Sequence, residues 1–95
     1  MPEAPTRTAN AAPAHVAPSF PCSGQLSNVE RMICADAALA ERDNRLSDVY
    51  KQARSRPGVT DSQRAWIRIR NACADPVCIA RAYDLRIGEL RAALR

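Results

Sequence analysis

Residues 22–36 of the chain read CSGQLSNVERMICAD, and residues 73–78 read CADPVC. The two stretches contain all four cysteines of the 95-residue chain, which are Cys22, Cys34, Cys73 and Cys78. An even number of cysteines in so short a chain indicates a disulfide framework, provided that the protein reaches an oxidising compartment. Of the three possible connectivities, the simplest joins the two cysteines within each stretch. The first bridge would tie an extended segment to a helix, and the second would lock a corner between two helices.

Two other uses of the cysteines are weaker alternatives. Zinc sites usually contain pairs of cysteines about two to four residues apart, whereas eleven residues separate Cys22 from Cys34. The one histidine, His15, lies in a segment rich in proline and alanine. A catalytic redox role is not indicated, because the chain has no Cys-x-x-Cys motif. We therefore expect no metal ion and no cofactor.

Helix start and stop signals divide the first half of the domain into two helices. The segment Ser27–Glu30 matches a capping box, in which the serine and the glutamate each bond to the backbone of the other. Asp36 is a second N-cap, for a longer helix that we expect to run to about Arg54. Pro57 and Gly58 then break the chain.

The second half contains signals for two more helices. Thr60–Gln63 resembles another capping box, which predicts a helix from there through Cys73. Asp75 and Pro76 predict the start of a last helix, because proline is well tolerated in the first helical turn. That helix would reach about Leu94. With no stretch of strand-like alternation, the sequence predicts an all-α fold, a small bundle of about four helices stapled by two disulfides.

Each of the three longer helices has an apolar face when its residues are placed at about 100° per residue. On the first of them the face comprises Leu39, Leu46, Val49, Tyr50 and Ala53. On the next it comprises Ala65, Trp66, Ile69 and Cys73. On the last it comprises Ile79, Tyr83, Ile87, Leu90 and Leu94. We expect these faces to meet in one core, with the indole of Trp66 as its anchor.

Charged residues interrupt these apolar faces. Asp43 lies at the centre of its face, while Arg70 and Arg86 lie beside or within the other two. Ionised groups are rarely buried without partners. We therefore predict a structural ion cluster in which Asp43 pairs with Arg70, Arg86 or both. A charged binding pocket between the helices is the alternative interpretation.

Outside the helices, the amino-terminal segment has a different composition. Residues 1–19 combine prolines with alanine and threonine and show no apolar periodicity, so we expect a disordered Pro/Ala-rich tail or linker. Residues 20–95 would form the domain. No apolar run of membrane-spanning length occurs, and no signal peptide is visible. Oxidised cysteines would require an export segment or an anchor upstream of this sequence.

Composition and charge exclude several classes of function. Residues 20–95 contain no histidine and the chain has three glycines, so neither a histidine-activated nucleophile nor a phosphate-binding glycine loop is indicated. We therefore expect that the protein is not an enzyme. Residues 1–50 carry four basic and six acidic groups, against ten and four in residues 51–95. Nucleic-acid binding through Arg64, Arg68 and Arg81 is a third possibility, but it would require reduced cysteines and a cytoplasmic location.

The chain resembles the LprI-like lysozyme-inhibitor family over roughly residues 20–91. In the first half the resemblance rests on Cys22, Ser27-Asn28-Val29-Glu30, Ile33-Cys34-Ala35-Asp36, Leu39-Ala40, Asp43, Leu46 and Tyr50. In the second half it rests on Gln63-Arg64-Ala65-Trp66, Arg70, Cys73, Cys78, Tyr83, Arg86-Ile87 and Leu90. The resemblance implies an exported bacterial protein, periplasmic or extracellular, which is mostly helical and has paired cysteines. Some members are lipoproteins, and some are described as lysozyme inhibitors.

We therefore expect a protein that binds and inhibits a lysozyme-type peptidoglycan hydrolase, with self-protection as one role. Lysozymes are commonly basic, so an acidic surface would speed their association. Glu41 and Asp48 share the solvent face of one helix and are the candidate contact residues. The alternative is a non-inhibitory helical interaction module of a cell-envelope assembly. The sequence leaves the oligomeric state open.

Overall fold

A computed structural model of the chain describes residues 16–95, and it contains four helices and no strand in that range. The helices are α2 (Asn28–Ala35), α3 (Ala37–Ala53), α4 (Val59–Asn71) and α5 (Pro76–Ala93). The predicted all-α fold is therefore confirmed. Within the described residues, no helix is both long and apolar enough to cross a membrane.

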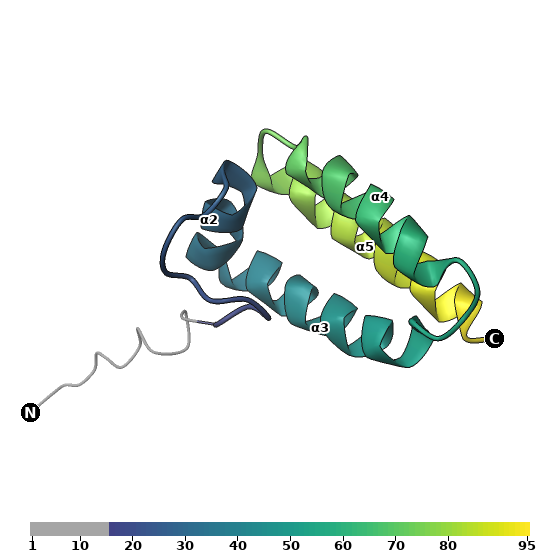
Figure 1. Ribbon diagram of the computed structural model, residues 1–95. Coiled ribbons are helices and arrows are strands. Elements are labelled where there is room, and N and C mark those ends of the chain that lie inside the picture. The colour runs from purple at the N-terminus through teal and green to yellow at the C-terminus, as the bar shows by residue number, and fades with distance from the viewer. Residues whose placement is uncertain (1–15) are drawn as a thin grey trace, which may run out of the picture.

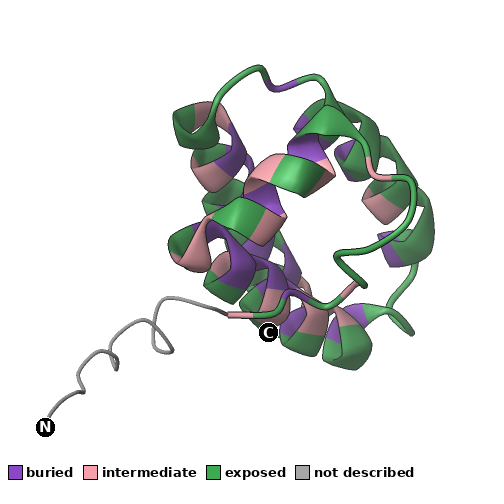
Figure 2. Cartoon of the chain, turned by 90° about the vertical axis from the view of Figure 1, so that its left-hand side faces the viewer, coloured by how far each residue is buried: buried purple, intermediate pink, exposed green. Residues whose placement is uncertain are grey.

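Helix α5 is the centre of the bundle. It packs against α3 on one side and against α4 on the other, while short α2 contacts all three at one end. Figure 1 shows α4 and α5 lying side by side, with α3 below them and α2 across the end of the bundle. The buried segments of the helices face the interior in the end-on view (Figure 2). The core thus forms along α5, where the other three helices meet.

The caps explain where three of the helices begin. Ser27 Oγ accepts from the Glu30 amide at 3.1 Å, and Glu30 Oε1 accepts from the Ser27 amide at 2.9 Å, which confirms this capping box. Asp36 caps α3 by accepting from the amides of residues 38 and 39. Asp75 accepts from the Cys78 amide at 2.9 Å and so caps α5, with proline in its first turn.

The second predicted capping box, at Thr60, is wrong. Helix α4 begins at Val59, and its N-cap is Gly58, which has a φ of 78° and makes no side-chain capping bond. Glycine adopts the left-handed backbone conformation without steric strain, so the chain can turn sharply here. The turn brings Val59 into the core, where only 7% of its surface is exposed. Burial of that side chain therefore moves the start of the helix ahead of Thr60.

The apolar faces predicted for α3 and α5 are largely buried, but the face of α4 is rotated. Ile69, which we placed in the core, is 62% exposed, and Ala65 is exposed as well. The buried positions of α4 are instead Val59, Trp66 and Arg70. This orientation lets two polar groups of α4 bond to α5, because Trp66 Nε1 donates to a backbone carbonyl there and the Arg70 guanidinium donates to a buried hydroxyl.

Both predicted disulfides are present. The first joins Cys22 to Cys34, with Cα atoms 5.9 Å apart, and ties the segment before α2 to the end of that helix. The second joins Cys73 to Cys78, with Cα atoms 5.5 Å apart, and closes the turn between α4 and α5. Together the bridges staple a chain that is too short to bury a large core.

We predict that reducing both bridges unfolds the domain at physiological temperature. Loop-closure entropy assigns about 3 kcal/mol to the longer loop and about 2 kcal/mol to the shorter one, together a large part of the stability of a small domain. Thermal unfolding followed by circular dichroism, with and without excess reductant, measures the effect. An unchanged melting temperature in reductant, with free thiols confirmed by titration, would show that the bridges are not structural.

Candidate functional site

A chain of buried polar groups joins three helices. The hydroxyl of Tyr83 on α5 donates to Asp43 Oδ1 on α3 at 2.7 Å. The same hydroxyl accepts from Arg70 Nη1 on α4 at 3.1 Å. The backbone amide and the hydroxyl of Ser19 both donate to Asp43 Oδ2 at 2.6 Å. The carboxylate of Asp43 is thus satisfied by three hydrogen bonds, although its residue is only 5% exposed.

The predicted pairing of Asp43 needs correction. Asp43, Arg70 and Arg86 are all buried, but among the described residues no direct ion pair joins Asp43 to either arginine. Arg70 reaches the carboxylate through the hydroxyl of Tyr83, which lies between them. Sequence reasoning placed Tyr83 on an apolar face and overlooked that a buried phenol needs a hydrogen-bond partner.

The carboxylate also binds a segment that we expected to be disordered. Ser19 donates to Asp43, Asn44 Nδ2 donates to the carbonyl of Ala17 at 2.8 Å, and Pro18 is buried. Residues 17–19 therefore pack against α3. Residues 1–15 of the expected tail lie outside the described part of the chain. No sequence signal marked this contact, because it depends on the buried acceptor.

Arg70 makes further contacts that hold it in place. Its guanidinium lies 5.8 Å from the ring centroid of Trp66, in a cation–π arrangement. Its Nε and Nη2 atoms donate to Asn71 Oδ1 at 3.1 and 2.9 Å. The indole of Trp66 packs edge-on against Tyr83, with ring centroids 5.0 Å apart. Trp66 is therefore a buried core residue that also supports the polar chain.

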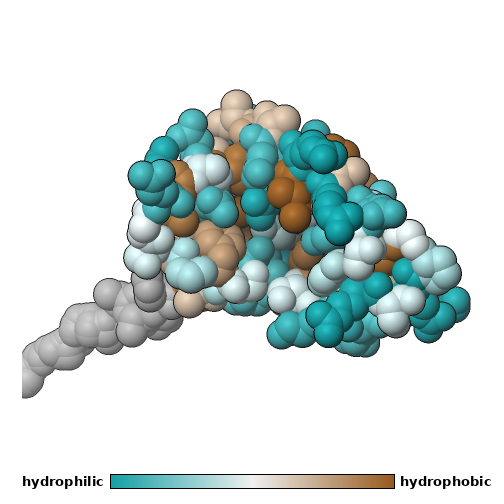
Figure 3. All heavy atoms as spheres, viewed as in Figure 1, coloured by the Kyte–Doolittle hydropathy of each residue, from teal (hydrophilic) through white to brown (hydrophobic). Residues whose placement is uncertain are grey.

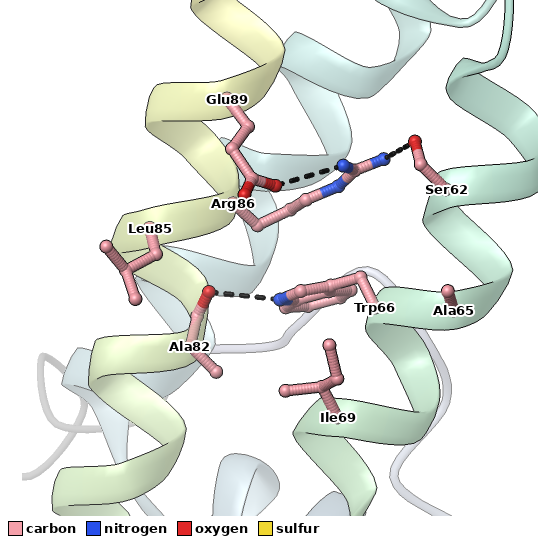
Figure 4. A pocket seen from close by; sticks show the side chains of 8 residues that line it. All are labelled: Ser62, Ala65, Trp66, Ile69, Ala82, Leu85, Arg86 and Glu89. Atoms are coloured by element: carbon pink, nitrogen blue, oxygen red, sulfur yellow. Dashed lines mark hydrogen bonds and ion pairs between the residues drawn. The ribbon is translucent and has the colours of Figure 1, made fainter.

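Arg86 belongs to a separate network, which ties α5 to the first turns of α4. Its Nε donates to Gln63 Oε1 at 2.9 Å, and its Nη2 donates to Ser62 Oγ at 2.9 Å. Its Nη1 forms an ion pair with Glu89 Oε1 at 3.1 Å. Figure 4 shows this guanidinium between Ser62 and Glu89. The sequence correctly marked a buried arginine here, but not its partners.

A cleft of about 410 Å³, lined by both polar and apolar side chains, opens between α3 and α4. Its lining includes Asp43 and Arg70, whose polar atoms are bonded to Tyr83 and to other neighbours. Among the described residues, no group of carboxylate, imidazole and thiol side chains comes together as a set of metal ligands. The alternative interpretation of a charged pocket thus has a cavity, but the two buried charges beside it are already engaged within the fold.

The predicted partner-binding residues lie on the solvent face of α3. Glu41 and Asp48 are both exposed and lie two helical turns apart, so they project from the same side of the helix. Neither forms an ion pair within the described residues. Exposed Arg45 lies between them in the sequence, which makes this face mixed in charge. In Figure 3 the surface over the second half of α3 is mainly hydrophilic.

An apolar groove follows the outer seam between α4 and α5, and sequence reasoning missed it. Two adjoining hollows, of about 210 and 260 Å³, share Ile69, Ala82 and Leu85 as lining residues. Leu85 is 66% exposed and Ile69 is 62% exposed. Figure 4 shows Ile69 next to the buried indole of Trp66, and Leu85 on α5 beyond Ala82. The groove was missed because Ile69 had been assigned to the core.

We predict that Asp43→Asn destabilises the domain by about 2–3 kcal/mol, because an amide cannot accept all the hydrogen bonds that the carboxylate accepts. Chemical unfolding of the oxidised protein measures the change. The matched control is Asp48→Asn on the exposed face of the same helix, which should change stability by less than about 0.5 kcal/mol. Equal effects of the two substitutions would contradict a structural role for the buried carboxylate.

Burial, and secondarily the hydrogen bond to Asp43, raise the pKa of Tyr83 above its ordinary value. Folding therefore favours the neutral phenol, whereas the unfolded chain ionises it near pH 10. We predict that this contribution to stability is fully present below about pH 10 and is lost as the pH rises above that value. Unfolding free energies between pH 8 and about pH 11, compared with those of Tyr83→Phe, test this. An alkaline decline of the same slope in both proteins would contradict it.

Known proteins provide an independent comparison. A family model described as "Lysozyme inhibitor LprI" matches residues 22–90. A protein named "Lipoprotein LprI" from Mycobacterium bovis is 34% identical over 82 residues, which cover 79% of this chain and 42% of the relative. A protein of the same name from Mycobacterium tuberculosis matches with the same values. No solved structure matches the chain significantly.

The match includes every residue of the buried network except Ser19, and it includes all four cysteines. The chain spans less than half the length of the curated relatives that it matches. Since the family model covers most of the domain, the resemblance inferred from the sequence is confirmed. The chain belongs to the LprI lysozyme inhibitor family.

Proposed function

We propose that this chain is an exported protein that binds a lysozyme-type peptidoglycan hydrolase and inhibits it. The observation that carries the proposal is the family match over residues 22–90, most of the domain. The names of the relatives support export, since both are called lipoproteins. The two disulfides are consistent with an oxidising compartment.

The proposed mechanism is steric and requires no reaction by this chain. An inhibitor that blocks a catalytic cleft needs a rigid surface, because less conformational freedom is then lost on binding. The disulfides supply that rigidity at the end of the bundle where α2 and the α4–α5 turn lie, and the buried hydrogen bonds supply it at the centre. A helix face or a helix end would cover the cleft of the hydrolase.

We assign the contact to the solvent face of α3, through Glu41 and Asp48. Both side chains are exposed, and acidic groups favour association with basic lysozymes. The formal net charge of the chain is +4, so attraction to a basic partner has to come from a local surface rather than from the whole molecule. Self-protection, in which the producing cell shields its own peptidoglycan from a hydrolase, is the role we propose for this binding.

A second candidate is a non-inhibitory interaction module of the cell envelope. The apolar groove between α4 and α5 favours it, because exposed apolar surface of this kind commonly marks an interaction site. Neither candidate uses the surface of the other. Binding without inhibition would support the module, whereas loss of inhibition on changing α3 would support the inhibitor.

We predict that the oxidised domain inhibits at least one lysozyme type stoichiometrically in a peptidoglycan-lysis assay. Combining Glu41→Gln with Asp48→Asn should weaken that inhibition about tenfold, mainly by slowing association at low salt. Lysis rates at increasing inhibitor concentration, with binding recorded in parallel for several lysozyme types, provide the measurement.

The control for this variant is Asp61→Asn combined with Asp84→Asn, which changes the net charge equally but removes exposed acids from α4 and α5. If the control weakens inhibition as much as the α3 variant does, the contact is not on α3. If the folded wild-type domain neither binds nor inhibits any lysozyme type, the proposed function is wrong and the interaction module takes its place.

A further inference from the structure

The outer surface of α4 and α5 contains most of the large exposed apolar side chains of the described chain. Leu85 and Ile69 border the apolar groove, and Val77, which is 67% exposed, lies further along α5. Small residues form much of the remaining lining, namely Ala65, Ala72 and Ala82. Large projecting side chains beside small ones offer both ridges and a groove for a packed helix.

The exposed row of α5 that borders the groove has a regular order of charge. Val77, Arg81, Leu85 and Glu89 follow one another at intervals of four residues, so they lie along one side of the helix. All four are exposed. The lining of the groove therefore includes a cation, Arg81, on one side of Leu85 and an anion, Glu89, on the other.

Arg81 and Glu89 both have polar atoms that could form further hydrogen bonds or ion pairs. Among the described residues, the guanidinium of Arg81 makes no ion pair and no hydrogen bond, although it borders the apolar groove. Glu89 is engaged through Oε1, which accepts from Arg86, and its side chain is 65% exposed. Its second carboxylate oxygen has no hydrogen-bond partner within the described range.

We propose that the groove between α4 and α5 is a homodimer interface, in which a second copy of this chain packs its α5 antiparallel across a two-fold axis near Leu85. An antiparallel arrangement centred there places Arg81 of each copy opposite Glu89 of the other, because both lie four residues from the centre. The charge complementarity is therefore satisfied twice by one symmetry operation. A parallel arrangement would place like charges opposite each other.

The apolar residues fit the same arrangement. Leu85 of each copy lies at the axis, where the small residues of the groove allow close approach of the helices. The row from Val77 to Glu89 is about 18 Å long, so the interface is small and the association is concentration-dependent. This dimer goes beyond the proposed inhibition and leaves the α3 face of each copy free.

Sedimentation equilibrium of the oxidised full chain, from micromolar to millimolar concentration, tests the interface. The wild type should show a monomer–dimer equilibrium, and Leu85→Gln should weaken dimerisation at least tenfold. Ile67→Gln is the matched control, because Ile67 lies on α4 outside the groove and is 38% exposed. A wild type that stays monomeric throughout, or a dimer that Leu85→Gln leaves intact, would overturn the proposal.

A charge exchange tests the register. Arg81→Glu alone and Glu89→Arg alone each place like charges opposite one another in a homodimer, so each should weaken dimerisation at least tenfold. An equimolar mixture of the two variants restores both opposite-charge pairs in the heterodimer, and the mixture should dimerise like the wild type. The Arg81→Glu/Glu89→Arg double variant should recover as well, and its thermal unfolding shows whether the loss of the Arg86 contact is tolerated.

Failure of the mixture to dimerise, although both variants are folded, would overturn the antiparallel register.

Lysis assays on the same proteins separate this proposal from the proposed inhibition. Suppose that the wild type is monomeric at every concentration and that Leu85→Gln abolishes its inhibition. The hydrolase, and not a second copy, then occupies the groove. If inhibition is absent but the dimer forms as described, the interface stands without the inhibitory function.

Discussion

The hydroxyl group of Tyr83 lies between Asp43 and Arg70, donating a hydrogen bond to the carboxylate and accepting one from the guanidinium group. This contact joins α5 to α3 and α4, and through Asp43 it also holds Ser19. A buried carboxylate and a buried guanidinium are both costly unless their polar atoms are satisfied. The helices must therefore adopt the one arrangement in which the phenol reaches both groups.

The same contact determines the orientation of α4 and hence its exposed surface. To bring Arg70 to Tyr83, α4 turns so that Trp66 faces the core and Ile69 faces the solvent. The apolar groove on the outer seam follows from that rotation. The buried network and the groove thus both follow from the orientation of α4. The face of α3 that contains Glu41 and Asp48 takes part in neither.

The sequence predicted much of this fold because its local signals were strong. Local pairing, the simplest of the three connectivities, proved correct. The caps at Ser27, Asp36 and Asp75 predicted three helix starts, and periodicity predicted the buried faces of α3 and α5. The prediction of the buried face failed at α4. There the face that contains Ile69 is purely apolar, and the neighbouring face, which is the buried one, contains the cation Arg70. Only the distant partners of Arg70 favour the second face, and no local pattern encodes them. Ser19 was missed for the same reason, since its acceptor is far away in the sequence.

A double-mutant cycle on Asp43→Asn and Tyr83→Phe tests most directly whether one shared hydrogen bond organises the domain. The unfolding free energies of the wild type, both single variants and the double variant of the oxidised protein give the coupling between the two side chains. The structure predicts a coupling of at least about 1 kcal/mol, as expected for residues in one buried network. Additivity within about 0.3–0.5 kcal/mol would contradict it, because the two groups would then act independently.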